Sequence, residues 1–156
     1  MADDQSTALL RGLTEPQRQS VGVARAQALA ATGRLADARE YLASLAADFP
    51  RNPTIQQQYA AALTDAQDPA QLHAALDRWR ALEQANRPGS AAWFHAKYGL
   101  ALTHSKLGNY ERAARMIELT RVLHPELGGA QLKAQFETLL QRCREQHSGG
   151  APAREK

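Results

Sequence analysis

The sequence predicts an all-α fold of about seven helices, arranged as stacked antiparallel hairpins. Three observations predict it. Ala, Leu, Gln, Arg and Glu dominate the chain, and the period-two alternation that marks a strand never persists. Capping residues and Gly or Pro terminators divide the chain into segments of helical length. A small residue, a large apolar residue and a Pro also recur three times in the same order, which indicates an internal repeat.

Length and composition fit one globular domain. The chain has 156 residues, 44% hydrophobic and 22% charged, enough to bury about two thirds of the surface that the unfolded chain exposes. The net charge of +3 comes from scattered Arg, which is typical of solvated helix faces, so we do not expect nucleic acid as a partner. No apolar run approaches the ~20 residues that cross a bilayer, and the acidic start differs from a signal peptide. We therefore expect a cytoplasmic protein that is not in a membrane.

The first expected hairpin spans residues 14–50. Thr14 can cap its first helix, because its side-chain oxygen can accept from the backbone N–H three residues on, where the Gln17 side chain can reciprocate. Gly33 can take the left-handed conformation that ends this helix. The second helix stops at Pro50, which cannot continue a helix.

The second expected hairpin spans residues 52–88. Asn52 is placed to cap its first helix, with Pro53 in the first turn, where its missing N–H costs nothing. Asp68 and Pro69 repeat this arrangement at the start of the second helix. That helix should end before Pro88.

The third expected hairpin spans residues 90–125. Ser90 is placed to cap its first helix and Gly108 to end it. Asn109 is the expected cap of the second helix, which Pro125 ends. Trp93 and the adjacent Phe94 are not expected to face inward together, so one of them should lie at the surface.

A last helix is expected at about 129–146. One of its faces is apolar and the opposite face is polar, which indicates a helix that caps the stack. The apolar positions are Leu132, Phe136, Leu139, Leu140 and Cys143. Residues 1–13 are expected to be a flexible or short helical segment, and residues 147–156 a disordered tail. The repeat domain as a whole is therefore expected at 14–146.

The three hairpins share one register. Three kinds of residue recur at separations of 37 and 38: the small residues Ala38, Ala75 and Ala113, the large residues Leu42, Trp79 and Ile117, and the terminators Pro50, Pro88 and Pro125. Two antiparallel helices approach closely only where a small side chain lies at their crossing, and the large side chain fills the adjacent groove. A single hairpin leaves apolar surface exposed, so equivalent hairpins stack.

This pattern resembles the tetratricopeptide repeat family. The residues that carry the resemblance are Ala26 and Ala38, Ala101 and Ala113, each pair twelve positions apart, the turn residues Gly33 and Gly108, and the terminators Pro50 and Pro125. The resemblance covers about residues 19–127. The second repeat departs from it, with Asp68-Pro69 where the family has a Gly turn. The resemblance implies a right-handed superhelical stack, an α-solenoid, that acts as a non-enzymatic scaffold for a protein or peptide partner.

In this family the first helix of each repeat lines a concave groove. Carried over by register, the resemblance implies nine groove residues: Gln27, Thr54, Gln57, Ala61, Asp65, His95, Tyr98, Leu102 and Lys106. Their amides, imidazole, phenol and ammonium could satisfy the backbone and one acidic group of an extended peptide. The alternative is that these residues are simply exposed helix faces. The paired Asn positions of the family's carboxylate clamp are absent in this register.

No catalytic or metal-binding constellation emerges. The five His residues have no metal-ligand spacing, and the chain lacks GxSxG and phosphate-loop motifs. Cys143, the single Cys, cannot form an internal disulfide and falls on an apolar stripe, where a thiol behaves as a small hydrophobe. We therefore expect no enzyme, no cofactor and no metal.

Two other functions stay open. The basic pI near 9.3 admits an RNA-binding helical repeat, whose affinity would fall steeply with salt. The first hairpin has no preceding polar cap, which admits a small chaperone or assembly factor that dimerises through its N-terminal end. It also admits another homo-oligomer or a part of a longer repeat array.

Overall fold

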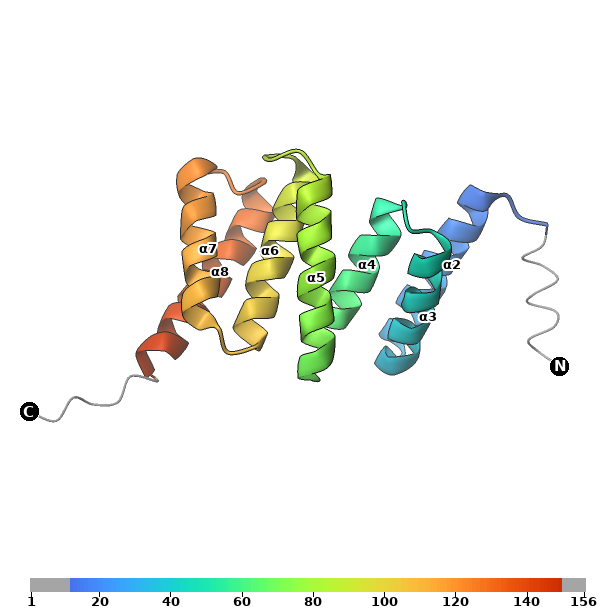
Figure 1. Cartoon of the computed structure of the whole chain (residues 1–156), viewed down its shortest axis with the longest axis horizontal. Helices are drawn as coiled ribbons and strands as arrows, with labels where there is room; N and C mark the ends of the chain where they lie inside the picture. Colours follow the sequence, from blue (N-terminus) through green and yellow to red (C-terminus); the bar gives the residue numbers. More distant parts are fainter. Residues whose placement is uncertain (1–11, 150–156) are drawn as a thin grey trace, which may run out of the picture. The chain divides into compact units, whose positions relative to one another are not determined.

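The computed structural model describes residues 12–149, and this part of the chain is all-α, with seven helices and no strand (Figure 1). The helices are α2 (Glu15–Ala31), α3 (Leu35–Asp48), α4 (Pro53–Thr64), α5 (Pro69–Ala85), α6 (Ala91–Lys106), α7 (Tyr110–Leu123) and α8 (Ala130–Gly149). The predicted fold class is confirmed. The expected end segments fall largely outside the described residues, and α8 continues to Gly149, beyond the end expected at 146.

The chain divides into two compact units, one up to Ala62 and one from Leu63 onward. The first unit contains the α2–α3 hairpin and most of α4. Its core joins all three helices and centres on Ile55, whose side chain is fully buried. The other buried members are Ala26, Leu42, Leu45 and Ala46. Asn52 caps α4 as expected, because its Oδ1 accepts from the Ile55 N–H at 3.1 Å.

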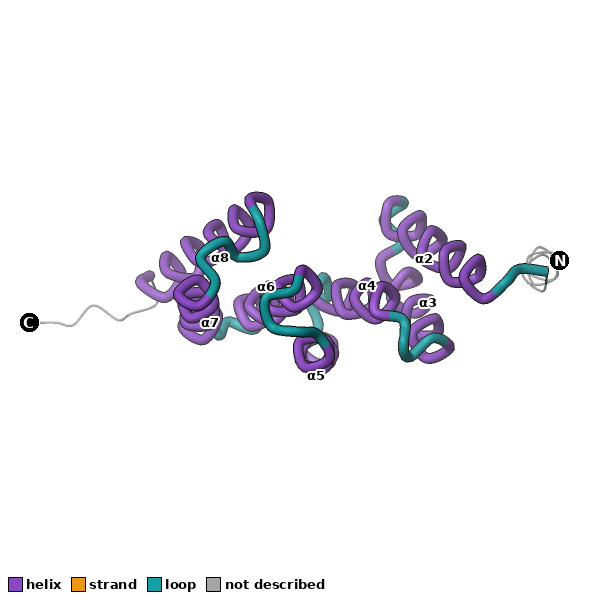
Figure 2. Tube along the Cα trace, turned by 90° about the horizontal axis from the view of Figure 1, so that it is seen from above, coloured by secondary structure: helices purple, strands orange, loops and turns teal. Residues whose placement is uncertain are grey.

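The second unit contains α5, α6, α7 and α8, in which each helix packs along the next and α6 also contacts α8. Within this unit α6 and α8 lie to one side and α5 and α7 to the other when seen from above (Figure 2). Its main core lies among α6, α7 and α8, where Ile117 and Phe136 are almost completely buried. The apolar stripe expected on the last helix is therefore the face that seals this core.

Two turns between paired helices have the same geometry, as a repeat requires. Gly33 and Gly108 have φ of 79° and 78°, the left-handed conformation that glycine adopts without steric cost. In both turns the glycine N–H donates to the carbonyl oxygen three residues earlier in the chain, at 3.0 Å. The N–H of the next residue donates to the carbonyl oxygen five residues before it, at 2.9 Å. The side chain of Asn109 makes no capping hydrogen bond, so that expectation is wrong. Its backbone dihedrals match those of Arg34, the equivalent residue, so the turn conformation and not an Asn cap starts α7.

The repeated small and large residues all lie in the interior. Ala38, Ala75 and Ala113 have at most 3% of their surface exposed. The large residues that follow them, Leu42, Trp79 and Ile117, are buried as well. The small and large positions that recur in the sequence are therefore buried positions in all three hairpins.

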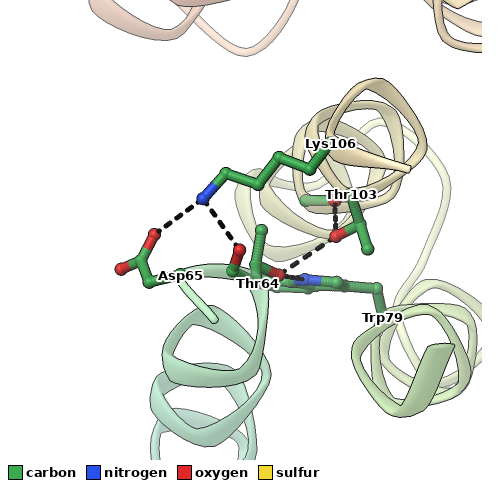
Figure 3. A network of polar contacts seen from close by, with 6 residues as sticks. Thr64, Asp65, Trp79, Thr103 and Lys106 are labelled. Atoms are coloured by element: carbon green, nitrogen blue, oxygen red, sulfur yellow. Dashed lines mark hydrogen bonds and ion pairs between the residues drawn. The ribbon is translucent and has the colours of Figure 1, made fainter. Parts of the chain in front are cut away.

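A buried polar network in the second unit joins the last turn of α4 to α5 and α6 (Figure 3). The indole N–H of Trp79 donates to Thr64 Oγ1 at 2.8 Å, and the Thr64 and Thr103 hydroxyls are hydrogen-bonded at 3.0 Å. The Thr103 hydroxyl donates to the carbonyl of Gly99 at 2.7 Å. The Trp79 ring also lies directly against Gly99, where an added Cβ would come within 2.3 Å of a ring carbon. The network thus fixes the Trp79 indole in one orientation.

Both aromatic residues at the start of α6 are buried, which corrects the expectation that one of them faces solvent. Trp93 is 8% and Phe94 6% exposed. The loop after α7 covers the second of them, because the His124 ring makes edge contacts with both aromatic rings and Gly128 lies against Phe94. The helical pattern of the sequence indicates only the neighbouring helices, and it gives no sign of the loop that covers α6.

Candidate functional site

The first unit has a groove between α2 and the start of α4. It is lined by Gln19, Ser20, Val23, Ala24, Gln27, Asn52, Thr54 and Ile55, and it encloses about 350 Å³. Two predicted groove residues, Gln27 and Thr54, therefore lie at one site. Asn52 Nδ2 donates to Gln19 Oε1 at 2.8 Å, which ties the two walls together at one point. Both walls are first helices of their hairpins.

The second unit has a comparable groove between α6 and α8. It is lined by Tyr98, Ala134, Gln135, Thr138, Leu139 and Arg142 and encloses about 230 Å³. Small-molecule pockets usually hold about 300–1,000 Å³, so this shallow site suits a side chain of a peptide better than a whole ligand. The Tyr98 ring packs edge-on against Phe136 at a centroid distance of 5.3 Å, which holds the phenol at the groove. Burial raises the pKa of Tyr98, an effect that the nearby Arg142 partly opposes, so the hydroxyl keeps its proton.

Two further predicted residues, Asp65 and Lys106, lie together at the ends of α4 and α6 (Figure 3). Lys106 Nζ donates to the carbonyl of Thr64 at 2.8 Å and lies 3.4 Å from Asp65 Oδ1. The ammonium therefore satisfies a carbonyl at the C-terminal end of α4. Lys106 therefore has a structural role at the end of α4 whether or not it binds a ligand.

The remaining predicted residues are less closely grouped. His95 is exposed on α6 and Leu102 is half-buried there, packed against the core of the second unit. Gln57 and Ala61 are half-buried on α4, three and seven positions after Thr54, and therefore on the same helix face. A binding role for all nine residues stays a prediction.

The contribution of α8 to the second groove is not among the sequence-based predictions. Gln135, Thr138 and Arg142 lie on the polar face that was interpreted as the outer face of a capping helix. The order of the helices could have indicated this contribution. Helices α6 and α7 form a complete hairpin, so α8, which follows them, occupies the position of the first helix of a next hairpin. Its polar face then lines a groove, as the polar faces of the other first helices do.

The described residues contain few other groups with the properties of a chemical site. His104 is buried with 3% of its surface exposed, and its Nδ1 has no hydrogen-bond partner. Burial and nearby Arg and His charges lower the pKa of His104 to about 4, so the imidazole is neutral at pH 7. Between residues 12 and 149 no three His, Cys, Asp or Glu side chains gather in a way that could hold a metal ion. No helix in this range combines the length and the apolar character needed to span a bilayer.

The fold and the two grooves define a helical-repeat protein with grooves between successive first helices. Comparison with known families agrees. Residues 21–62 match the family model described as tetratricopeptide repeat. The match runs from α2 through α3 to nearly the end of α4, and it confirms the family resemblance that the sequence indicated. No curated protein and no solved structure matches the chain.

Proposed function

We propose that this protein is a non-enzymatic scaffold whose first helices hold an extended segment of a protein partner. The observation that carries the proposal is that each unit has a groove between two successive first helices: α2 and α4 in one unit, and α6 and α8 in the other. The family match over residues 21–62 supports it, because a tetratricopeptide repeat suggests a protein partner.

The groove side chains have the chemistry that an extended segment needs. Such a segment has backbone N–H and C=O groups that cost about 1–3 kcal/mol each if they are buried without a partner. The side-chain amides of Gln27 and Gln135 and the Tyr98 hydroxyl make no hydrogen bond within residues 12–149, so their donors and acceptors are available. Arg142 is exposed and makes no ion pair with a described residue, which suits an acidic group on the bound segment.

The test is affinity capture with a groove variant and a matched control. Gln135→Ala combined with Arg142→Ala removes two exposed groove side chains and leaves the core intact, whereas a change at Lys106 would disturb the end of α4. The control, Glu40→Ala with Asp77→Ala, removes the same number of exposed polar side chains from α3 and α5. Quantitative mass spectrometry should find proteins that the wild type and the control retain and the groove variant loses. Equal capture by all three proteins contradicts the proposal.

A further inference from the structure

Helix α7 carries a second apolar face that is exposed to solvent. Leu119, Val122 and Leu123 are 59%, 76% and 72% exposed, and they are three of the five large hydrophobic residues that are exposed in the described part of the chain. Their spacing of i, i+3 and i+4 places them on one side of the helix, which we call the α7 stripe. The opposite side of α7 buries Ala113 and Ile117 in the core. A helix in this position needs only one apolar face to fold.

The repeat does not require the α7 stripe. The stripe residues lie two, five and six positions after the buried large residue Ile117. The same positions can be compared in the other second helices by counting from Leu42 and Trp79. They are Ser44, Ala47 and Asp48 in α3, Ala81, Gln84 and Ala85 in α5, and Leu119, Val122 and Leu123 in α7. All nine are exposed, but only those in α7 are large and apolar. The α7 stripe is therefore a property of this helix alone, and packing within the chain does not account for it.

The charge beside the stripe is also particular to α7. Arg112 and Arg115 lie seven and four residues before Leu119, so they continue the same helix face toward the N-terminal end. The equivalent positions are Asp37 and Glu40 in α3, and Ala74 and Asp77 in α5. The face of α7 thus reads basic and then apolar, where the other second helices have acidic or small residues and then small or polar ones.

Nearby carboxylates cancel only part of this basic end. Glu111 forms an ion pair with Arg115 at 2.6 Å, and Glu118, beside the stripe, is paired with Arg144 of α8 at 2.6 Å. Arg112 forms no ion pair among the described residues. The surface therefore keeps a positive charge at one end and an apolar patch at the other.

We propose that the α7 stripe docks one amphipathic helix of a partner protein, with apolar residues at i, i+3 and i+4 spacing and acidic residues at the end that lies over Arg112 and Arg115. A helix laid along another helix presents apolar side chains at this spacing, and acidic residues complement the guanidinium groups. A second copy of this chain fits less well, because a stable interface buries about 800 Å² per partner. Three side chains form a patch of a few hundred Å², the size of a single-helix site. This site is separate from the grooves of α6 and α8.

The experiment uses the full chain and three synthetic helical peptides. The first has Leu at the stated spacing and Glu at one end, the second replaces Glu by Lys, and the third replaces Leu by Ser. Binding is measured by fluorescence anisotropy, and the contact surface is mapped by amide chemical shifts. The acidic peptide should bind at least about tenfold more tightly than either of the others, and the shifted amides should belong to α7. Arg112→Glu with Arg115→Glu should reverse the preference between Glu and Lys peptides.

A triple variant of the α7 stripe and a double control variant distinguish binding at this surface from nonspecific hydrophobic binding. Leu119→Ser, Val122→Ser and Leu123→Ser together should weaken acidic-peptide binding at least about tenfold without unfolding, because the side chains are exposed. The control, Val21→Ser with Leu35→Ser, removes the other exposed hydrophobics and should bind like the wild type. Equal binding of the acidic and basic peptides, no binding of any peptide, or shifts outside α7 would overturn the proposal. Wild-type self-association that the triple variant abolishes would overturn it in favour of a second copy.

Discussion

Replacing Gly99 by Ala tests the packing of the second unit most sharply, because two effects of opposite sign compete. Gly is about 1 kcal/mol less favourable than Ala inside a helix, so propensity alone predicts a more stable protein. The new Cβ, however, would lie 2.3 and 2.4 Å from two carbon atoms of the Trp79 ring, whereas such atoms rest about 3.5–4.0 Å apart. The rigid indole must therefore move by roughly 1 Å.

The magnitude follows from what this movement disturbs. Overpacking of a core costs about 1–3 kcal/mol, and displacing the indole weakens its 2.8 Å hydrogen bond to Thr64, worth about 1 kcal/mol. After the propensity gain is subtracted, the free energy of unfolding of Gly99→Ala should fall by about 1–3 kcal/mol. For a unit of this size, each kcal/mol lowers the unfolding midpoint by about 4–8 °C.

Tryptophan fluorescence is the direct assay, because the chain has two Trp residues, Trp79 and Trp93, and both lie in the second unit. The control is the same Gly99→Ala change in a Trp79→Leu background, where the smaller side chain leaves room for the Cβ and the loss should shrink. A Gly99→Ala protein that melts at a higher temperature than the wild type would refute the close contact between Gly99 and the indole.

Three further predictions concern stability. Folding lowers the pKa of His104 from 6.5 to about 4, so the folded state binds fewer protons than the unfolded state between these pH values. The free energy of unfolding is therefore highest above pH 6.5 and declines toward pH 4. Urea unfolding at a series of pH values should show this loss, about 3 kcal/mol at most, and the loss should be smaller in His104→Leu. Parallel pH profiles of the two proteins would contradict it. Asp68→Ala should cost about 0.5–2 kcal/mol in urea unfolding, since Asp68 Oδ1 accepts from the Ala70 N–H at 3.3 Å, whereas Asp68→Asn, which can still cap, should cost less. Phe136→Ala should cost about 3–5 kcal/mol in thermal unfolding, because the ring is completely buried against Tyr98, and a loss below 1 kcal/mol would argue against that packing.

The elements and their ends could be predicted because local signals determine them. Asn52, Asp68 and Ser90 accept from backbone N–H groups at the starts of their helices, and Gly33 and Gly108 adopt the expected left-handed conformation. These contacts involve residues close in the sequence. The recurring Ala and large apolar residues could be predicted as interior for a similar reason, since each hairpin repeats the same short-range packing.

Long-range contacts could not be predicted in the same way. Lys106 bonds to a carbonyl on another helix, and Phe94 is covered by a loop that begins thirty residues later in the chain. The closeness of Gly99 to Trp79 likewise depends on how two helices meet. In the candidate site, the residues of α8 were missed because a polar helix face looks the same in sequence whether it meets solvent or lines a groove.

Site-specific crosslinking in cells tests the central claim most directly. A photoreactive amino acid is placed singly at groove positions Gln27 and Gln135, and at the exposed outer positions Glu40 and Asp77. We expect illumination to join a protein partner to the chain from the groove positions and not from the outer ones. Crosslinks that form equally from all four positions, or only from Glu40 and Asp77, would contradict the claim that the first helices hold the partner.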